Sequence, residues 1–290
     1  MSCLTTFRPG RVPPVSPRNC LPRTGGSTWD GTYASFRSFR AEPVTREGGE
    51  GIRMNHADFL AGISFRRIQP TDQLPGNMFF ADDFALQSTN TVLPADGLRL
   101  TENIRSVWDI PKMSTFAIGA ILNRFVSQLA PGHAYVNVGV WHGFTFLAGL
   151  ANHPDKTCIG VDNFSAFGGP RDRFQYYFQR HKSGNHAFHE MDYVEYFKRV
   201  HKELIGCYLF DGPHDYHNQL LALQIAEPYF ANGCVILVDD TNWADPRRAT
   251  LDFIASRPGR YRILLDVRTA GNGHPTYWNG LIVFQKWQES

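Results

Sequence analysis

Two stretches decide the fold: Ile205-Gly-Cys-Tyr-Leu-Phe-Asp-Gly-Pro-His214 and Gly233-Cys-Val-Ile-Leu-Val-Asp-Asp240. Each begins with an uninterrupted apolar run that leads into carboxylates, and the first acid of the second stretch follows that of the first by 28 residues. Apolar runs of this length are typical of strands that are buried on both faces of a parallel sheet. The ligand crevice of an open α/β sheet lies beyond the carboxyl ends of its strands, so we expect three acids and a histidine to meet there.

The three acids, Asp211, Asp239 and Asp240, would repel one another unless a cation lay among them. Sites rich in oxygen ligands suit hard divalent ions such as Mg²⁺ or Mn²⁺. We therefore predict a divalent metal site formed by these acids, one of which can act through a water molecule, with His214 beside it as general base. The plainer alternative is that Asp211 and Asp239 cap the helices that follow the two strands.

Strands and helices alternate along most of the chain, and connections that contain a helix join parallel strands. The last two predicted strands are joined by a Gly-rich link, Thr269–Pro275, which is too short for a helix, so this pair should be antiparallel. We predict an α/β fold with a Rossmann-like, seven-stranded, mostly parallel sheet, a terminal antiparallel strand pair and helices on both faces. The expected strands are 134–140, 157–162, 186–190, 205–210, 233–238, 261–267 and 277–284, and the expected helices are 113–129, 144–151, 171–181, 193–202, 216–230 and 247–256.

The first 53 residues differ from the rest, because they contain 8 Arg, no Lys, 6 Pro and 7 Gly with little apolar periodicity. Such a composition buries too little apolar surface to offset chain entropy, so we predict a disordered leader over 1–53. Gly and Glu have purine-rich codons, so the segment Gly48-Gly-Glu-Gly51 suggests a ribosome-binding site that has been translated as protein, with Met54 as the true start. An organelle transit peptide is the alternative. We expect a helical or irregular extension over 54–101 and the main domain over 102–290.

Composition argues against several classes of protein. The chain has 29 Lys+Arg and 27 Asp+Glu, and it shows no clustered basic face of the kind that nucleic-acid-binding proteins carry. No run of about 18 apolar residues occurs, so we predict no transmembrane helix. The five cysteines form no C-x-x-C pair, and Cys158, Cys207 and Cys234 lie in predicted strands. They are typical of reduced core residues in a cytoplasmic protein.

A glycine turn, Gly139-Val-Trp-His-Gly143, follows the first predicted strand and opens a helix, so backbone can approach a ligand closely there. The spacing is not G-x-G-x-x-G, because Trp141 stands between the glycines, and a pyrophosphate cradle is therefore disfavoured. Asp162 ends the second strand, where an acid can hydrogen-bond ribose hydroxyls, and Asp192 after the third could accept from an adenine amino group. Structural glycines and turn residues are the alternative. The predicted cofactor-binding residues are Asn137, Gly139, Gly143, Thr145, Asp162, Asn163, Asp192 and Asp211.

From about Asn103 to its end, the chain resembles class I S-adenosylmethionine-dependent O-methyltransferases, and within them the macrocin O-methyltransferase group, which acts on sugar hydroxyls of natural products. Catechol-type metal-dependent methyltransferases are similar, but they carry Lys in place of His214 and usually Asn in place of Asp240, so the sugar branch is favoured. Asn137 stands where an acid is more usual. The resemblance rests on Asn137, Gly139 and Gly143, on Asp162, on Asp211-Gly-Pro-His-Asp-Tyr216 and on Asp239-Asp240.

The resemblance implies that S-adenosylmethionine is the methyl donor and that a hydroxyl of a small molecule, a sugar or a glycosylated natural product, is the acceptor. It also implies that the metal lowers the pKa of the acceptor hydroxyls and that His214 takes the proton. His217 is an alternative base or an exposed helix residue, and Trp243 is expected to shape the acceptor pocket. Catechol-type O-methylation and a nicotinamide-dependent oxidoreductase are the alternative functions. No nucleic-acid or membrane partner is expected, and a homo-oligomer is compatible with the sequence.

Overall fold

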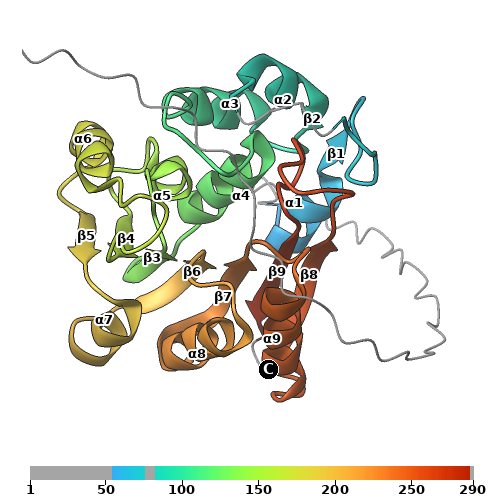
Figure 1. Ribbon diagram of the computed structural model, residues 1–290. Coiled ribbons are helices and arrows are strands. Elements are labelled where there is room, and N and C mark those ends of the chain that lie inside the picture. Colours follow the sequence, from blue (N-terminus) through green and yellow to red (C-terminus); the bar gives the residue numbers. More distant parts are fainter. Residues whose placement is uncertain (1–53, 76–81, 288–290) are drawn as a thin grey trace, which may run out of the picture. The chain divides into compact units, whose positions relative to one another are not determined.

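The computed structural model describes residues 54–75 and 82–287, which belong to one compact unit (Figure 1). The predicted leader, residues 1–53, and the ribosome-binding segment within it lie outside the described residues. Within the described ranges, none of the helices has the length and apolar character needed to cross a membrane.

A seven-stranded sheet forms the centre of this unit, in the strand order β5-β4-β3-β6-β7-β9-β8. Strands β3 to β7 run parallel, and β9 pairs antiparallel with both β7 and β8. The chain moves outward from β3 to β5 and then returns to place β6 on the other side of β3, which opens a crevice at their carboxyl ends. The predicted Rossmann-like sheet with its terminal antiparallel pair is confirmed. The strands are β3 (His133–Val138), β4 (Thr157–Asp162), β5 (His186–Glu190), β6 (Leu204–Phe210), β7 (Phe230–Val238), β8 (Tyr261–Val267) and β9 (Leu281–Lys286).

Helices cover both faces of the sheet, as predicted, because side chains of successive strand residues point to opposite faces. On β6, Tyr208 and Phe210 belong to one buried cluster, whereas Cys207 and Leu209 belong to the other. Helices α4 to α6 belong to the cluster of Cys207 and Leu209, and helices α7 to α9 belong to the cluster of Tyr208 and Phe210. The helices are α4 (Phe116–Ser127), α5 (Phe144–Leu150), α6 (Arg171–His181), α7 (Tyr193–Arg199), α8 (Tyr216–Ala226) and α9 (Ala244–Ala255).

The segment before α4 shares the core of the sheet and does not have a core of its own. Phe59, Leu60 and Leu100 are buried in the same cluster as α4 and α5. The predicted boundary between residues 101 and 102 falls inside a helix, so the extension and the main domain are continuous in the structure. The elements of this segment are α1 (His56–Gly62), β1 (Ser64–Phe65), α2 (Phe84–Asn90), β2 (Thr91–Val92) and α3 (Gly97–Arg105), with β1 and β2 antiparallel.

Most predicted elements differ from the structure by a few residues at their ends, and two of these differences have a clear physical cause. The helix predicted over 216–230 ends at Ala226 and continues as a 3₁₀ turn, Glu227–Tyr229, because Pro228 has no N–H to continue the α-helix. The strand predicted over 277–284 begins only at Leu281. Trp278 and Gly280 have φ angles of 51° and 86°, a left-handed conformation that a strand cannot contain.

Candidate functional site

A pocket of about 720 Å³ lies at the carboxyl ends of the parallel strands. Two groups of residues line it. The first, here called the glycine-turn side, comprises Gly139, Trp141, the loop 162–167 and Asp192. The second, the acid side, comprises Asp211, His214, Asp239, Asp240, Trp243 and the β8–β9 link around Asn272, Gly273, Trp278 and Asn279. Both groups follow strand ends, as expected of an α/β sheet.

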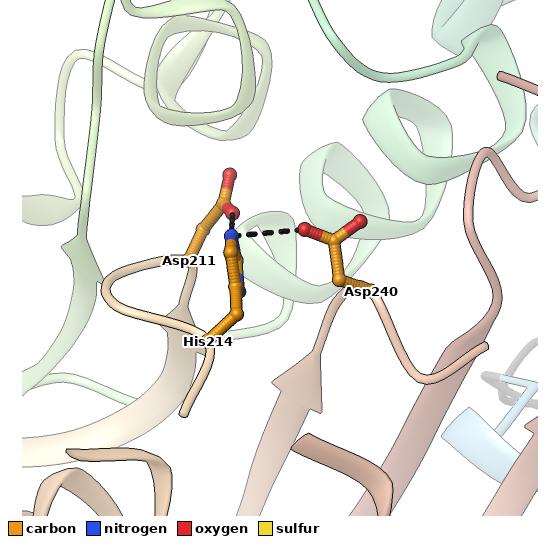
Figure 2. Close-up of side chains that lie close together, drawn as sticks. All are labelled: Asp211, His214 and Asp240. Atoms are coloured by element: carbon orange, nitrogen blue, oxygen red, sulfur yellow. Dashed lines mark ion pairs between the residues drawn. The ribbon is translucent and has the colours of Figure 1, made fainter. Parts of the chain in front are cut away.

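On the acid side, Asp211, His214 and Asp240 converge (Figure 2). His214 Nε2 lies 2.9 Å from Asp240 Oδ2 and 3.9 Å from Asp211 Oδ1. One ligand atom from each of the three residues lies within 4.8 Å of the others. The tips of β6 and β7 therefore bring two carboxylates and one imidazole to a single point, where we expected three acids and a histidine.

Burial and mutual repulsion shift the pKa values of this group. Burial, followed by the charge of Asp240, raises the pKa of Asp211 to about 7, although the charge of His214 offsets part of the shift. Burial lowers the pKa of His214, but its hydrogen bond to Asp240 and the charge of Asp211 outweigh burial, so the net shift is upward. Without a cation, Asp211 and His214 therefore hold their protons to a higher pH than the same groups do in water.

Asp239 lies apart from this convergence. Its carboxylate accepts a hydrogen bond from the backbone N–H of Asp240 at 2.9 Å, and its side chain is buried at the pocket wall. Burial, followed by the charges of Asp240 and Asp211, raises its pKa well above the usual range. The three residues that the structure brings together are thus not the three predicted metal ligands, because His214 takes the place of Asp239.

Neither strand-end acid acts as a helix cap. Helix α8 is capped by Asp215, whose side chain accepts from the backbone N–H of Asn218. The N-cap position of α9 is Trp243, which makes no capping hydrogen bond with its side chain. The capping alternative for Asp211 and Asp239 is therefore wrong, and both side chains are left to face the pocket.

The glycine turn is held directly against the acid side. The backbone N–H of Asp211 donates to the carbonyl of Val138, and a Cβ on Gly139 would lie 1.9 Å from the carbonyl oxygen of Asp211. Gly139 has a φ of 79°, which a residue without Cβ adopts freely. Glycine is required here by both conformation and close approach, and the two sides of the pocket are mechanically joined at this point.

Asp162 organises the glycine turn through its carboxylate. Its Oδ2 accepts from the backbone N–H groups of Val140 and Trp141 at 2.8 and 2.9 Å, and its Oδ1 accepts from Phe164 N–H at 2.7 Å. It lines the pocket as predicted, although its oxygens already serve the backbone. A carboxylate has about four acceptor sites, so one of them can still accept from a ribose hydroxyl.

Three predicted cofactor-binding residues lie behind the turn and do not line the pocket. Asn137 is fully buried; its Oδ1 accepts from Thr145 Oγ1 at 3.0 Å and its Nδ2 donates to the Gly139 carbonyl at 3.0 Å. Gly143 is the N-cap residue of α5, and a Cβ there would meet the ring of Phe174 at 2.8 Å. Asn137, Gly143 and Thr145 therefore brace the turn, and their contact with the cofactor stays a prediction.

The remaining predicted contacts are exposed. Asp192 lines the pocket and also caps α7, accepting from the backbone N–H groups of Val194 and Glu195. Asn163 lines the pocket as well, and its Oδ1 accepts from Ser165 N–H at 3.0 Å. Of the rival residues, His217 is exposed and does not line the pocket, whereas Trp243 does and contacts the His214 ring edge-on at 5.0 Å between centroids.

Sequence reasoning missed the contribution of the β8–β9 link to the pocket. Asn279 donates from Nδ2 to Asp240 Oδ1 at 2.5 Å, and Trp278 forms part of the wall. Both positions lay within a predicted strand. The one signal that could have exposed them is Asn279-Gly280, a pair typical of turns.

The donor set at the acid side fits a divalent cation. Carboxylates are the ligands that Mg²⁺ and Mn²⁺ prefer. Asp211 and Asp240 each present a carboxylate oxygen to the same point, and His214 Nε2 lies between them. The residues present can therefore hold the predicted ion.

Residues 136–241 match the sequence model of a protein family described as a methyltransferase domain. None of the curated proteins searched matches the chain. Among solved structures, the chain is similar to an O-methyltransferase from Bacillus cereus in complex with SAH, at 17% identity and a TM-score of 0.47, covering 67% of this chain and 92% of that one. It is also similar to an SAH-bound methyltransferase from Podospora anserina, at 14% identity and a TM-score of 0.48, covering 75% and 99%. Residues 136–241 are thus similar to a methyltransferase domain, and this range extends from within β3 to just beyond β7, across the parallel strands of the Rossmann-like sheet.

Proposed function

We propose that this protein transfers a methyl group from S-adenosylmethionine to a hydroxyl of a small molecule, with the help of a divalent cation. The observation that carries the proposal is the convergence of Asp211, His214 and Asp240 within 4.8 Å, beside the glycine turn of a methyltransferase domain. Such a pocket can hold the donor on the glycine-turn side and the acceptor on the acid side. The acceptor class we favour is a sugar or a glycosylated natural product.

The donor would lie against Gly139, Asp162, Asn163 and Asp192. Gly139 presents no side chain, so the backbone is open to close approach of a ligand. Asp162 supplies acceptors for ribose hydroxyls, and Asp192 offers its second carboxylate oxygen to an adenine amino group. The turn is braced from behind by Asn137, so it need not reorganise when the donor binds.

On the acid side, Asp211 and Asp240 would hold Mg²⁺ or Mn²⁺, with Asp239 reaching it through a water molecule. When bound, the cation would lower the pKa of adjacent acceptor hydroxyls and fix their position. It would also compete with protons for the two carboxylates. His214 would then be free of its ion pair with Asp240 and would take the proton from the attacking hydroxyl. Trp243 packs edge-on against the His214 ring and limits its movement.

The acceptor preference rests on the residues around the cluster. Trp243 and Trp278 present aromatic surface beside the acids, and aromatic faces suit the C–H faces of sugars as well as planar rings. His214 and Asp240 separate this site from the catechol-type pattern, in which Lys and Asn stand at these positions. We therefore place sugar hydroxyls first and catechol-type acceptors second.

Calorimetry with S-adenosylmethionine and S-adenosylhomocysteine, with and without Mg²⁺, tests the donor and the ion. Methyl transfer to paired sugar and catechol acceptors then tests the acceptor class. Binding of NAD(H) in place of both sulfur ligands would reject the proposal.

His214→Ala tests the base. We expect nearly normal donor affinity and a kcat lowered by about 10²–10⁴-fold, the range for loss of a general base. His217→Ala is the matched control, because His217 is exposed, lies on the same helix entry and does not line the pocket. A His214→Ala enzyme with unimpaired kcat would remove His214 from this role.

A further inference from the structure

The turn Tyr277–Gly280 brings a remote part of the chain against the acid side. Gly280 has a φ of 86°, and a Cβ there would lie 2.7 Å from Asn242 Oδ1 and 3.1 Å from Thr241 Oγ1. The absence of a side chain lets the turn approach the segment that follows Asp240. The backbone N–H of Asn242 donates to the carbonyl of Asn279 at 2.7 Å, so the two segments are fastened together next to the cluster.

The orientation of the Asn279 amide is fixed from both ends. Its Oδ1 accepts from the backbone N–H of Gly273 at 2.8 Å, and its Nδ2 donates to Asp240 Oδ1 at 2.5 Å. Since only the oxygen of an amide accepts and only the nitrogen donates, reversing it would break both bonds. Asn279 as a whole residue is 7% exposed, so water does not readily replace either partner.

Asp240 needs such support. Its φ is 57°, a left-handed conformation that is uncommon for residues other than glycine and that Asp adopts when its short side chain is held by hydrogen bonds. Its backbone N–H is bound by Asp239, and its Oδ2 faces His214 at 2.9 Å. With Oδ1 held by Asn279, only Oδ2 points toward His214 and Asp211.

We infer that Asn279 is the positioning residue for Asp240: its amide holds one carboxylate oxygen so that the other faces the cation and His214. This inference rests on the proposed function for its chemistry, although the positioning itself does not depend on it. A hydrogen bond to a charged carboxylate inside the protein is stronger than a neutral one. Residues that orient metal ligands in this way typically contribute 10–100-fold to metal affinity or activity.

The test is Asn279→Ala in the full chain, with Mn²⁺ binding followed by electron paramagnetic resonance. We expect the Kd for Mn²⁺ to rise by about 10-fold or more, with donor affinity unchanged and kcat lowered more than the KM for the acceptor is raised. A crystal structure of the metal-free variant should show the Asp240 carboxylate rotated and its contact with His214 lengthened.

Asn90→Ala is the matched control for lost stability. Asn90 is 5% exposed, and its amide binds the backbone of Arg67 and Ile68 far along the chain from the acids, without lining the pocket. It should lower the melting temperature while leaving the Kd for Mn²⁺ unchanged.

An Asp240 carboxylate that keeps its place in the Asn279→Ala crystal would overturn the inference, whatever the binding data show. If the wild-type protein binds neither Mn²⁺ nor S-adenosylmethionine, the proposed function fails, and the crystal comparison still decides the role of Asn279. Wild-type Mn²⁺ affinity in a folded Asn279→Ala protein would also overturn it.

Discussion

The glycine-turn side and the acid side of the pocket are built in different ways. On the glycine-turn side, the polar side chains mainly serve the backbone: Asn137 and Asp162 together bind five backbone groups of the turn and its neighbours. On the acid side, Asp211, His214 and Asp240 mainly face one another. The first side is a surface of hydrogen-bonded backbone. The second is a cluster of charged side chains, whose negative charge must be compensated by protons or by a bound cation.

Gly139→Ala should break both sides at once, and it carries the largest expected effect. The added Cβ would overlap the Asp211 carbonyl, at 1.9 Å, and would occupy a φ of 79°. Moving β6 and its acid away from β3 should lower the free energy of unfolding by more than about 3 kcal/mol, as overpacking and strain combine. Chemical denaturation measures this loss, and calorimetry should show loss of both donor and Mg²⁺ binding.

Gly132→Ala separates the steric part of this effect from the conformational part. Gly132 has nearly the same φ, 80°, but no atom lies within 4 Å of its Cβ position. Only the left-handed conformation is penalised there, so we expect a loss of about 1–2 kcal/mol and unchanged binding. Equal losses in the two variants would show that contact between the glycine turn and Asp211 is not the reason for glycine at 139.

The same contrast explains what the sequence could predict. Asp211 and Asp240 could be expected at one edge because they follow apolar runs, and strand ends of a parallel sheet meet there whatever the loops do, whereas the separation of Asp239 from them depends on the local turn. The roles of Asn137 and Thr145 could not be predicted in this way, because a residue at a strand end can point into the ligand site or behind it. Asn279 was hidden for another reason: Tyr277-Trp278 favours a strand locally, and tertiary contacts at Gly280 impose a turn instead.

Stability as a function of pH should distinguish the acid side from the glycine-turn side. The pKa of Asp211 is raised to about 7 in the folded protein from an ordinary value of 3.8, chiefly by burial. The folded state thus binds this proton more tightly than the unfolded state, so the contribution to stability is present below about pH 4 and is lost as pH rises toward 7. The raised pKa values of Asp239 and His214 act in the same direction. A bound cation would replace these protons at high pH.

The expected result is a Mg²⁺-dependent rise in melting temperature that grows with pH. When the free Mg²⁺ concentration is about 100 times the Kd, binding contributes about 2.7 kcal/mol to stability, which raises the melting temperature by about 5–10 °C. We expect this rise at pH 8 and a much smaller one at pH 5. The difference with and without Mg²⁺ is the quantity to measure, since the half-buried His56 and the buried His153 have lowered pKa values and stabilise the fold as pH rises. Asp211→Asn should abolish the increment, and an increment independent of pH would contradict this account.

The smallest expected effect concerns Asp192, which serves the backbone and also lines the pocket. Its carboxylate caps α7 by accepting from Val194 N–H at 2.8 Å and Glu195 N–H at 3.3 Å. Asp192→Ala should therefore lower the free energy of unfolding by about 1 kcal/mol. If its free oxygen also accepts from the adenine amino group, S-adenosylmethionine should bind about 5-fold more weakly, the value of one lost hydrogen bond. Denaturation and calorimetry on the same sample measure the two losses.

Two further variants separate capping from ligand binding. Asp192→Asn retains an oxygen that can cap the helix, since Asn is as good a cap as Asp, and should keep most of the stability. Asp83→Ala removes the cap of α2, where the side chain accepts from Leu86 N–H at 2.8 Å outside the pocket, so it should cost similar stability without changing donor affinity. If Asp192→Ala, like Asp83→Ala, lowers stability without changing donor affinity, the Asp192 side chain serves only to cap α7, and the glycine-turn side binds the donor without it.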